Sequence, residues 1–245
     1  MKQTIRLLAL VAVAAGLAFA SCQKEDNSTA SNGSNGNNGG NNGGGQTTVE
    51  WVDLGLPSGL LWATCNLGAT SPEQYGDYYA WGETATKDVY NWSTYKYCTV
   101  DADGRLQTLT KYNTDTEYGT PDNMTTLEAA DDVATQKLGS GARTPTKAEW
   151  QELINNTADE RTTMNGVYGH KFTASNGKSL FLPAAGGRNG SELYDAGSGG
   201  NYWSSSLNAD CPYEAWVFFF YSGNQGVGNG HRRLSGSSVR AVRQN

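Results

Sequence analysis

The sequence is poor in charged and metal-binding side chains. Only 17% of its 245 residues are Asp, Glu, Lys or Arg, and it has two histidines and four cysteines. The formal net charge is −6. Nucleic acid is therefore not an expected partner, because domains that bind phosphate backbones carry a basic face. Since the cysteine spacing also fits no zinc pattern, we predict no bound metal and no cofactor.

Residues suited to catalysis are equally scarce. His170 and His231 lie outside any catalytic motif, and an isolated histidine is more often a satisfied surface or core residue. A carboxylate pair for hydrolysis has to converge in space, and four acids are candidates only because they are close in sequence: Glu192, Asp195, Asp210 and Glu214. We therefore predict no catalytic residues and a protein that is not an enzyme.

Glycine and tyrosine, in contrast, are abundant, with 31 and 13 residues. Such a composition indicates a loop-rich protein with short strands rather than a helical bundle. The sequence thus predicts an α+β domain with short antiparallel strands, two helices and long glycine-rich loops.

The first 21 residues have the pattern of a secretory signal. Lys2 and Arg6 precede an apolar run over residues 7–20 that is too short, with these flanks, for a transmembrane anchor. The segment FASC (19–22) resembles a bacterial lipobox, with Phe19 where the pattern usually has Leu. We expect cleavage before Cys22 and its lipidation, which anchors a protein without spanning the membrane. The alternative is an ordinary signal peptide with an incidental Cys22.

The next residues predict export and a tether. The acidic segment QKED (23–26) resembles the surface-export signal of Bacteroidota lipoproteins; the alternative is a charged start to a linker. Residues 27–48 are mostly Gly, Asn and Ser, with Ala30 as the only apolar side chain, a composition typical of a flexible linker. We expect a lipid-anchored outer-membrane protein, exposed on the cell surface and monomeric, whose folded domain spans residues 49–245.

Three cysteines remain after lipidation, and an exported chain permits disulfides. Because three cannot all pair internally, we predict a disulfide between Cys65 and Cys98, which both lie in scaffold-like sequence, with Cys211 left over.

Several elements have recognisable start and stop signals. Thr146 and Glu149 form a capping box that begins a helix, and Asn176-Gly177 joins two predicted strands. The DADG turn (101–104) predicts a hairpin. It also begins like a calcium loop, but the acidic residue that such a loop needs at its distal end is missing, so calcium binding is not favoured. The remaining predictions are strands around 49–54, 61–63, 99–100, 106–109, 168–173 and 179–182 and a helix over 126–138.

The C-terminal region holds an unusual strand, AWVFFFY (215–221). A half-buried strand alternates apolar with polar residues, but this one has no polar break from Trp216 to Tyr221. Either both faces are buried, or one face shows aromatic rings to water, as interaction surfaces do. We expect partial exposure, with these ligand contacts: Tyr213, Phe218, Phe220, Tyr221, Asn224, Asn229, His231, Arg232 and Arg233.

The register of this strand stays open. In the alternative register Val217, Phe219 and Tyr221 point outward. The residues expected in the core are Trp203, Trp216, Val239 and Val242.

Several motifs together resemble a known family. ARTPTKAEW (142–150) is similar to the R-L-P-T-x-x-E-W helix of the formylglycine-generating-enzyme type of C-type-lectin-like fold, and FLPAAGGR (181–188) and VRAVR (239–243) resemble the same group. WVDLGLPSGLLWATCNLGAT (51–70) and YGDYYAWGET (75–84) resemble the Fibrobacter succinogenes major paralogous domain of many Bacteroidota lipoproteins. The resemblance implies a C-type-lectin-like fold in which the first and last strands pair.

Some proteins of this fold are targets of diversity-generating retroelements, which rewrite adenine-containing codons near the C-terminus. Such rewriting does not reach Lys, Met or Trp. Residues 208–235 contain no Lys or Met, and their one Trp is Trp216. The resemblance therefore implies a hypervariable segment here; the alternative is a fixed glycine-rich loop.

The leading functional hypothesis is a binding module for a protein or other macromolecule, because Tyr, Ser, Gly and Asn also compose antibody loops. Calcium-dependent sugar binding needs Glu-Pro-Asn or Gln-Pro-Asp and Trp-Asn-Asp sets, which are absent. Calcium-independent glycan binding through stacked aromatic rings stays an alternative, as does a structural, adhesin-type surface protein.

Overall fold

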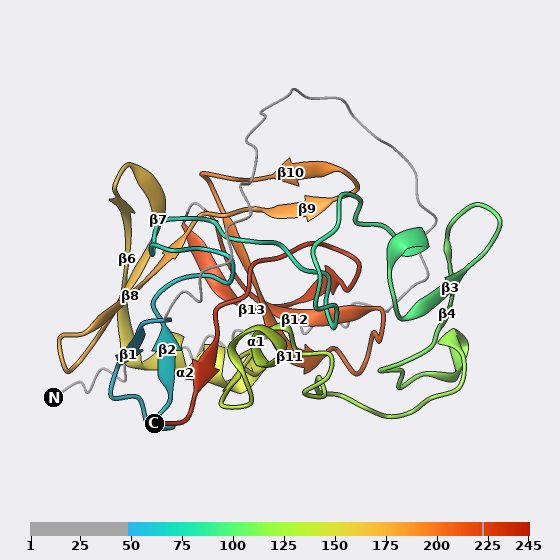
Figure 1. Cartoon of the computed structure of the whole chain (residues 1–245), viewed down its shortest axis with the longest axis horizontal. Coiled ribbons are helices and arrows are strands. Elements are labelled where there is room, and N and C mark those ends of the chain that lie inside the picture. Colours follow the sequence, from blue (N-terminus) through green and yellow to red (C-terminus); the bar gives the residue numbers. More distant parts are fainter. Residues whose placement is uncertain (1–48, 222) are drawn as a thin grey trace, which may run out of the picture.

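The computed structural model describes residues 49–221 and 223–245 (Figure 1). The predicted signal peptide, the predicted lipidation site Cys22 and the predicted tether all lie outside the described residues. The described part is an α+β domain built mainly from antiparallel strands, as the composition predicted.

Both ends of the domain meet in one sheet. Its four strands lie in the order β1 (Trp51–Asp53), β2 (Leu61–Ala63), β14 (Val242–Arg243), β5 (Ala142–Arg143). The expectation that the first and last strands pair is wrong in detail, since β14 pairs with β2 and β5 while β1 lies on the far side of β2.

A second sheet is a meander of β6 (Thr157–Met164), β7 (Val167–Ala174) and β8 (Ser179–Pro183). The hairpin predicted at Asn176-Gly177 is confirmed. Strand β6 was not predicted, because an edge strand with mostly exposed polar residues shows no apolar alternation.

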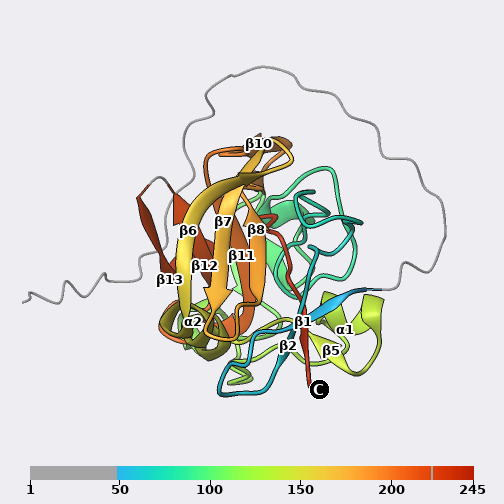
Figure 2. The same ribbon diagram turned by 90° about the vertical axis from the view of Figure 1, so that its left-hand side faces the viewer.

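The third sheet carries the aromatic strand in its middle, in the order β11 (Gly200–Leu207), β12 (Glu214–Tyr221), β13 (Asn224–Arg232). It lies against the meander and α2 (Figure 2). Phe218 stacks on Trp150 with ring centroids 4.9 Å apart, and Phe220 belongs to the same apolar cluster. On the opposite face Ala215 and Val217 join a second cluster. Both faces of β12 are therefore covered.

This double burial corrects three predictions. Phe218 and Phe220 are 0% and 1% exposed and cannot serve as ligand contacts. The alternative outward set fails at Val217, which is also buried, whereas Phe219 is half-buried and Tyr221 is exposed. Trp216, expected in the core, is half-buried beneath the ammonium group of Lys147, 3.1 Å from its ring centroid. The core predictions for Trp203, Val239 and Val242 are confirmed.

The two α-helices differ in how accurately the sequence predicted their bounds. Helix α2 (Lys147–Asn156) begins at the predicted capping box, in which Thr146 and Glu149 exchange hydrogen bonds. Helix α1 (Val133–Leu138) covers only the end of the predicted span, because the Asp132 carboxylate caps it by accepting from the backbone of Ala134. Among the described residues, no helix is long and apolar enough to cross a bilayer.

Two further hairpins lie beside the sheets. They are β3 (Cys98–Val100) with β4 (Leu106–Leu109), and β9 (Gly187–Asn189) with β10 (Glu192–Tyr194). Single 3₁₀ turns, η1 (Trp92–Thr94) and η2 (Thr116–Tyr118), flank the first of them. The predicted hairpin at 99–109 is thus confirmed.

The predicted Cys65–Cys98 disulfide is wrong, since both thiols are free. Cys65 follows β2, whereas Cys98 begins β3, and these strands lie far apart along the long axis of the molecule (Figure 1). The Cys98 thiol instead donates to the carbonyl of Trp92 over 3.2 Å. The expectation that Cys211 is left over is also wrong, because its sulfur is disulfide-bonded.

Candidate functional site

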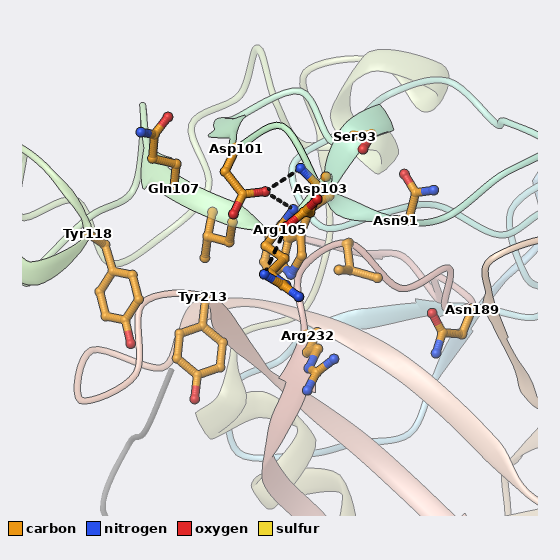
Figure 3. A pocket seen from close by; sticks show the side chains of 14 residues that line it. Asn91, Ser93, Asp101, Asp103, Arg105, Gln107, Tyr118, Asn189, Tyr213 and Arg232 are labelled. Atoms are coloured by element: carbon orange, nitrogen blue, oxygen red, sulfur yellow. Dashed lines mark hydrogen bonds and ion pairs between the residues drawn. The ribbon is translucent and has the colours of Figure 1, made fainter. Parts of the chain in front are cut away.

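A cavity of about 470 Å³ lies between the β3–β4 hairpin and the end of the third sheet where Tyr213 precedes β12 and Arg232 closes β13 (Figure 3). Six segments of the chain converge there. The lining residues are Asn91, Trp92, Ser93, Asp101, Asp103, Gly104, Arg105, Leu106, Gln107, Tyr118, Asn189, Tyr213, Arg232 and Leu234.

One side of the cavity is aromatic. The rings of Tyr118 and Tyr213 meet edge to face, with centroids 5.4 Å apart, and stand together in Figure 3. Leu106 and Leu234 add buried apolar surface. Burial raises the pKa of Tyr118 to about 12, so its phenol is neutral at physiological pH.

The other side is polar and carries charges of both signs. The guanidinium group of Arg105 lies 3.1 Å from the Asp103 carboxylate. One carboxylate oxygen of Asp101 accepts from the backbone of Asp103 and of Arg105, at 3.0 and 2.9 Å, and thereby shapes the turn. Figure 3 shows Arg105 and Arg232 approaching from two different segments. Two acids and two arginines therefore line one cavity.

Arg233 lies directly behind this site. Its side chain is 0% exposed, which rules out the ligand contact predicted for it. The guanidinium group donates to the Tyr95 hydroxyl and to the carbonyls of Lys111, Tyr112 and Pro212, all at 2.8–3.0 Å. Because Pro212 precedes Tyr213, this one side chain joins the aromatic wall to the segment that follows β4.

Aromatic rings complete the surroundings of Arg233. Its guanidinium carbon lies 5.0 Å from the ring centroid of Trp81 and 5.3 Å from that of Tyr95. Ring faces attract cations, and the attraction is largest where water is excluded. The rings and the carbonyls together offset the cost of burying the charge.

The segment that Arg233 holds is fixed from its other side by Asp131. The Asp131 carboxylate accepts from the ammonium group of Lys111 and from the hydroxyls of Tyr97 and Tyr112. Burial alone would raise the pKa of Asp131, but these hydrogen bonds outweigh it and lower the pKa to about 2. The Asp131 carboxylate and the Arg233 guanidinium group thus bracket residues 111–112.

The structure brings only two of the predicted contacts to the cavity, Tyr213 and Arg232. Tyr221 and Asn224 are exposed at the opposite end of the β12–β13 hairpin, where they pair with each other. His231 packs edge-on against Trp203, 5.1 Å between centroids, and its burial lowers its pKa to about 4, so the ring is neutral. The side chain of Asn229 lies outside the described residues.

Sequence reasoning missed most of the cavity. The turn at 101–105 was predicted as a hairpin turn and weighed as a calcium loop but not as part of a binding site, although its charged tip faces the C-terminal strands. No sequence pattern marked Tyr118 or Asn189 as a site residue, because nothing local to either residue shows which distant segment it meets. In residues 49–221 and 223–245 no group of three or more His, Cys, Asp or Glu is placed to hold a metal ion.

Comparison with known proteins adds no further assignment, since no family model, no curated protein and no solved structure matches this chain.

The network around Arg233 gives a stability prediction. Arg233→Met should lower the free energy of unfolding by about 3 kcal/mol or more, because it leaves several buried acceptors without a donor. Arg233→Lys should lose a large part of the same energy, since an ammonium group cannot reproduce the planar fork. Urea unfolding of the protein measures both changes.

The matched control is Arg105→Met, at an exposed arginine, which should change the free energy of unfolding by only about 0.5 kcal/mol. If Arg233→Met unfolds at the same urea concentration as Arg105→Met, the hydrogen bonds of the buried guanidinium group do not stabilise the fold.

Proposed function

We propose that this protein is a surface-displayed lipoprotein whose C-type-lectin-like domain binds a macromolecular ligand and performs no catalysis. The observation that carries the proposal is the cavity, to which Tyr213 and Arg232 bring two of the predicted contacts. Its volume of about 470 Å³ lies within the roughly 300–1,000 Å³ that is typical of ligand pockets.

The way the walls are held also favours binding. Arg233 fixes the loop before Tyr213, and Asp101 shapes the opposing turn. Walls fixed before a ligand arrives lose little conformational entropy on binding, which favours affinity. Tyrosines add large, rigid contact area with few rotatable bonds, as they do in antibody loops.

The C-type-lectin-like assignment remains part of the proposal. It is supported by the motifs quoted above, by the strand-rich α+β architecture and by the meeting of β2 and β14 in one sheet. It implies a single domain that acts as a monomer at the end of a tether.

Binding is tested with the mature chain against two immobilised panels, one of extracellular proteins and one of polysaccharides. We expect binding to at least one panel and a loss of about tenfold or more in Tyr213→Ala and Arg232→Ala, because both side chains line the cavity. Tyr168→Ala removes a tyrosine of β7 that is 52% exposed and should leave binding unchanged. Binding to neither panel, or binding that all three variants retain, would contradict the proposal.

The anchor is tested at Cys22. We expect cells fed labelled palmitate to label the protein, Cys22→Ser to abolish the label, and external protease to remove the wild-type domain from intact cells. A wild-type protein that takes up no label, or label that persists in Cys22→Ser, would overturn the anchor.

The proposed diversification of residues 208–235 is restricted by the fold. Phe218, Phe220 and Arg233 are buried, so rewriting them would cost stability; deleting a core phenylalanine side chain costs about 3–5 kcal/mol. Exposed or half-exposed positions such as Tyr221 and Asn224 carry no such constraint.

Sequencing this locus in sibling strains tests the diversification. We expect substitutions at adenine-containing codons for Tyr213, Tyr221 and Asn224, with the codons for Phe218 and Arg233 unchanged. Identical codons throughout 208–235, without a template repeat nearby, would contradict the diversification and indicate a fixed loop.

A further inference from the structure

Charge in the cavity is balanced. The carboxylates of Asp101 and Asp103 and the guanidinium groups of Arg105 and Arg232 all contribute to its lining. An anion placed beside the arginines would also meet the carboxylates, and a cation beside the carboxylates would meet the guanidinium groups. Since both arrangements include repulsion at short range, the lining favours a ligand without net charge.

The aromatic side offers a surface for an apolar face. Tyr213 is half-buried against Tyr118, and Leu106 and Leu234 lie beside them. The face of an aromatic ring is negative and attracts weakly positive C–H groups. A sugar ring presents such C–H groups on one face and hydroxyls around its edge.

The rim offers donors and acceptors together. Gln107 on β4 and Asn189 at the end of β9 are exposed amides, and Figure 3 shows them on opposite sides of the cavity. An amide both donates and accepts, a guanidinium group only donates, and a carboxylate only accepts. Hydroxyls also donate and accept, so a ring of hydroxyls finds partners in every direction.

We propose that the cavity binds one uncharged sugar residue of a glycan, with a ring face on Tyr213 and the hydroxyls toward Gln107, Asn189 and the charged groups. This inference rests on the proposed function and names its ligand class. A peptide fits less well, because protein–protein interfaces are depleted of Asp, whereas Asp101 and Asp103 both line this cavity.

The test is titration calorimetry on the mature chain in a zwitterionic detergent, since sugar-based detergents would compete. The probes are the methyl glycosides of glucose, galactose, mannose and N-acetylglucosamine, with glucuronic acid and glucosamine as charged comparators. We expect a dissociation constant of about 1 mM or tighter for at least one glycoside and about tenfold weaker binding of the charged sugars.

Three variants locate the binding. Tyr213→Ala should weaken it about tenfold. The double variant Gln107→Ala/Asn189→Ala should weaken it about fivefold; it removes exposed side chains only, so it remains informative if Tyr213→Ala disturbs the fold. The matched control is Gln151→Ala/Asn155→Ala, two amides on α2 that bond to each other, and it should not change binding.

Each contrary result has a distinct meaning. If no glycoside binds, if charged sugars bind as tightly as uncharged ones, or if both cavity variants bind as the wild type does, the sugar site is refuted. Cavity-dependent binding to the protein panel without glycoside binding refutes the sugar inference alone and leaves the proposed function standing.

Discussion

The buried guanidinium group of Arg233 is the contact on which the candidate site depends. A cation without a water shell is costly unless its donors are satisfied, and here hydroxyl and carbonyl oxygens receive them while the Trp81 ring lies 5.0 Å away. Those oxygens belong to segments that precede and follow the β3–β4 hairpin and to the loop before β12. Satisfying one charge therefore positions two walls of the cavity relative to each other.

The second constraint is the double burial of β12. Because Phe218 faces the cluster around Trp150 and Val217 faces the opposite cluster, the strand cannot slide or turn over without exposing one of the two sets. Its ends are thereby fixed in space. Tyr213 is brought to the cavity, and Tyr221 emerges at the far end, so the aromatic run itself is scaffold and only its ends can meet a ligand.

Features determined by nearby residues were predictable from sequence, such as the capping box at Thr146 and the turn at Asn176-Gly177, because their chemistry is local. Burial was not. Arg232 and Arg233 are adjacent and chemically alike, yet one lines the cavity and the other is enclosed, since β13 ends at Arg232 and Arg233 lies in the turn that follows. The burial of Arg233 depends on carbonyl groups more than a hundred residues away in sequence, such as that of Tyr112.

The two walls differ in origin, and this difference bears on how a variable site would work. The turn around Asp103 and the tyrosine at 118 lie outside residues 208–235, whereas Tyr213 and Arg232 lie within them. Rewriting that interval would change one wall and leave the other constant. Arg233 lies in the same interval, but its buried hydrogen bonds hold the walls of the cavity together. Rewriting would therefore have to leave Arg233 unchanged while it changes Arg232. In a site built this way, rewriting of Tyr213 and Arg232 would alter ligand preference, while the turn at Asp103 and the ring of Tyr118 would stay constant.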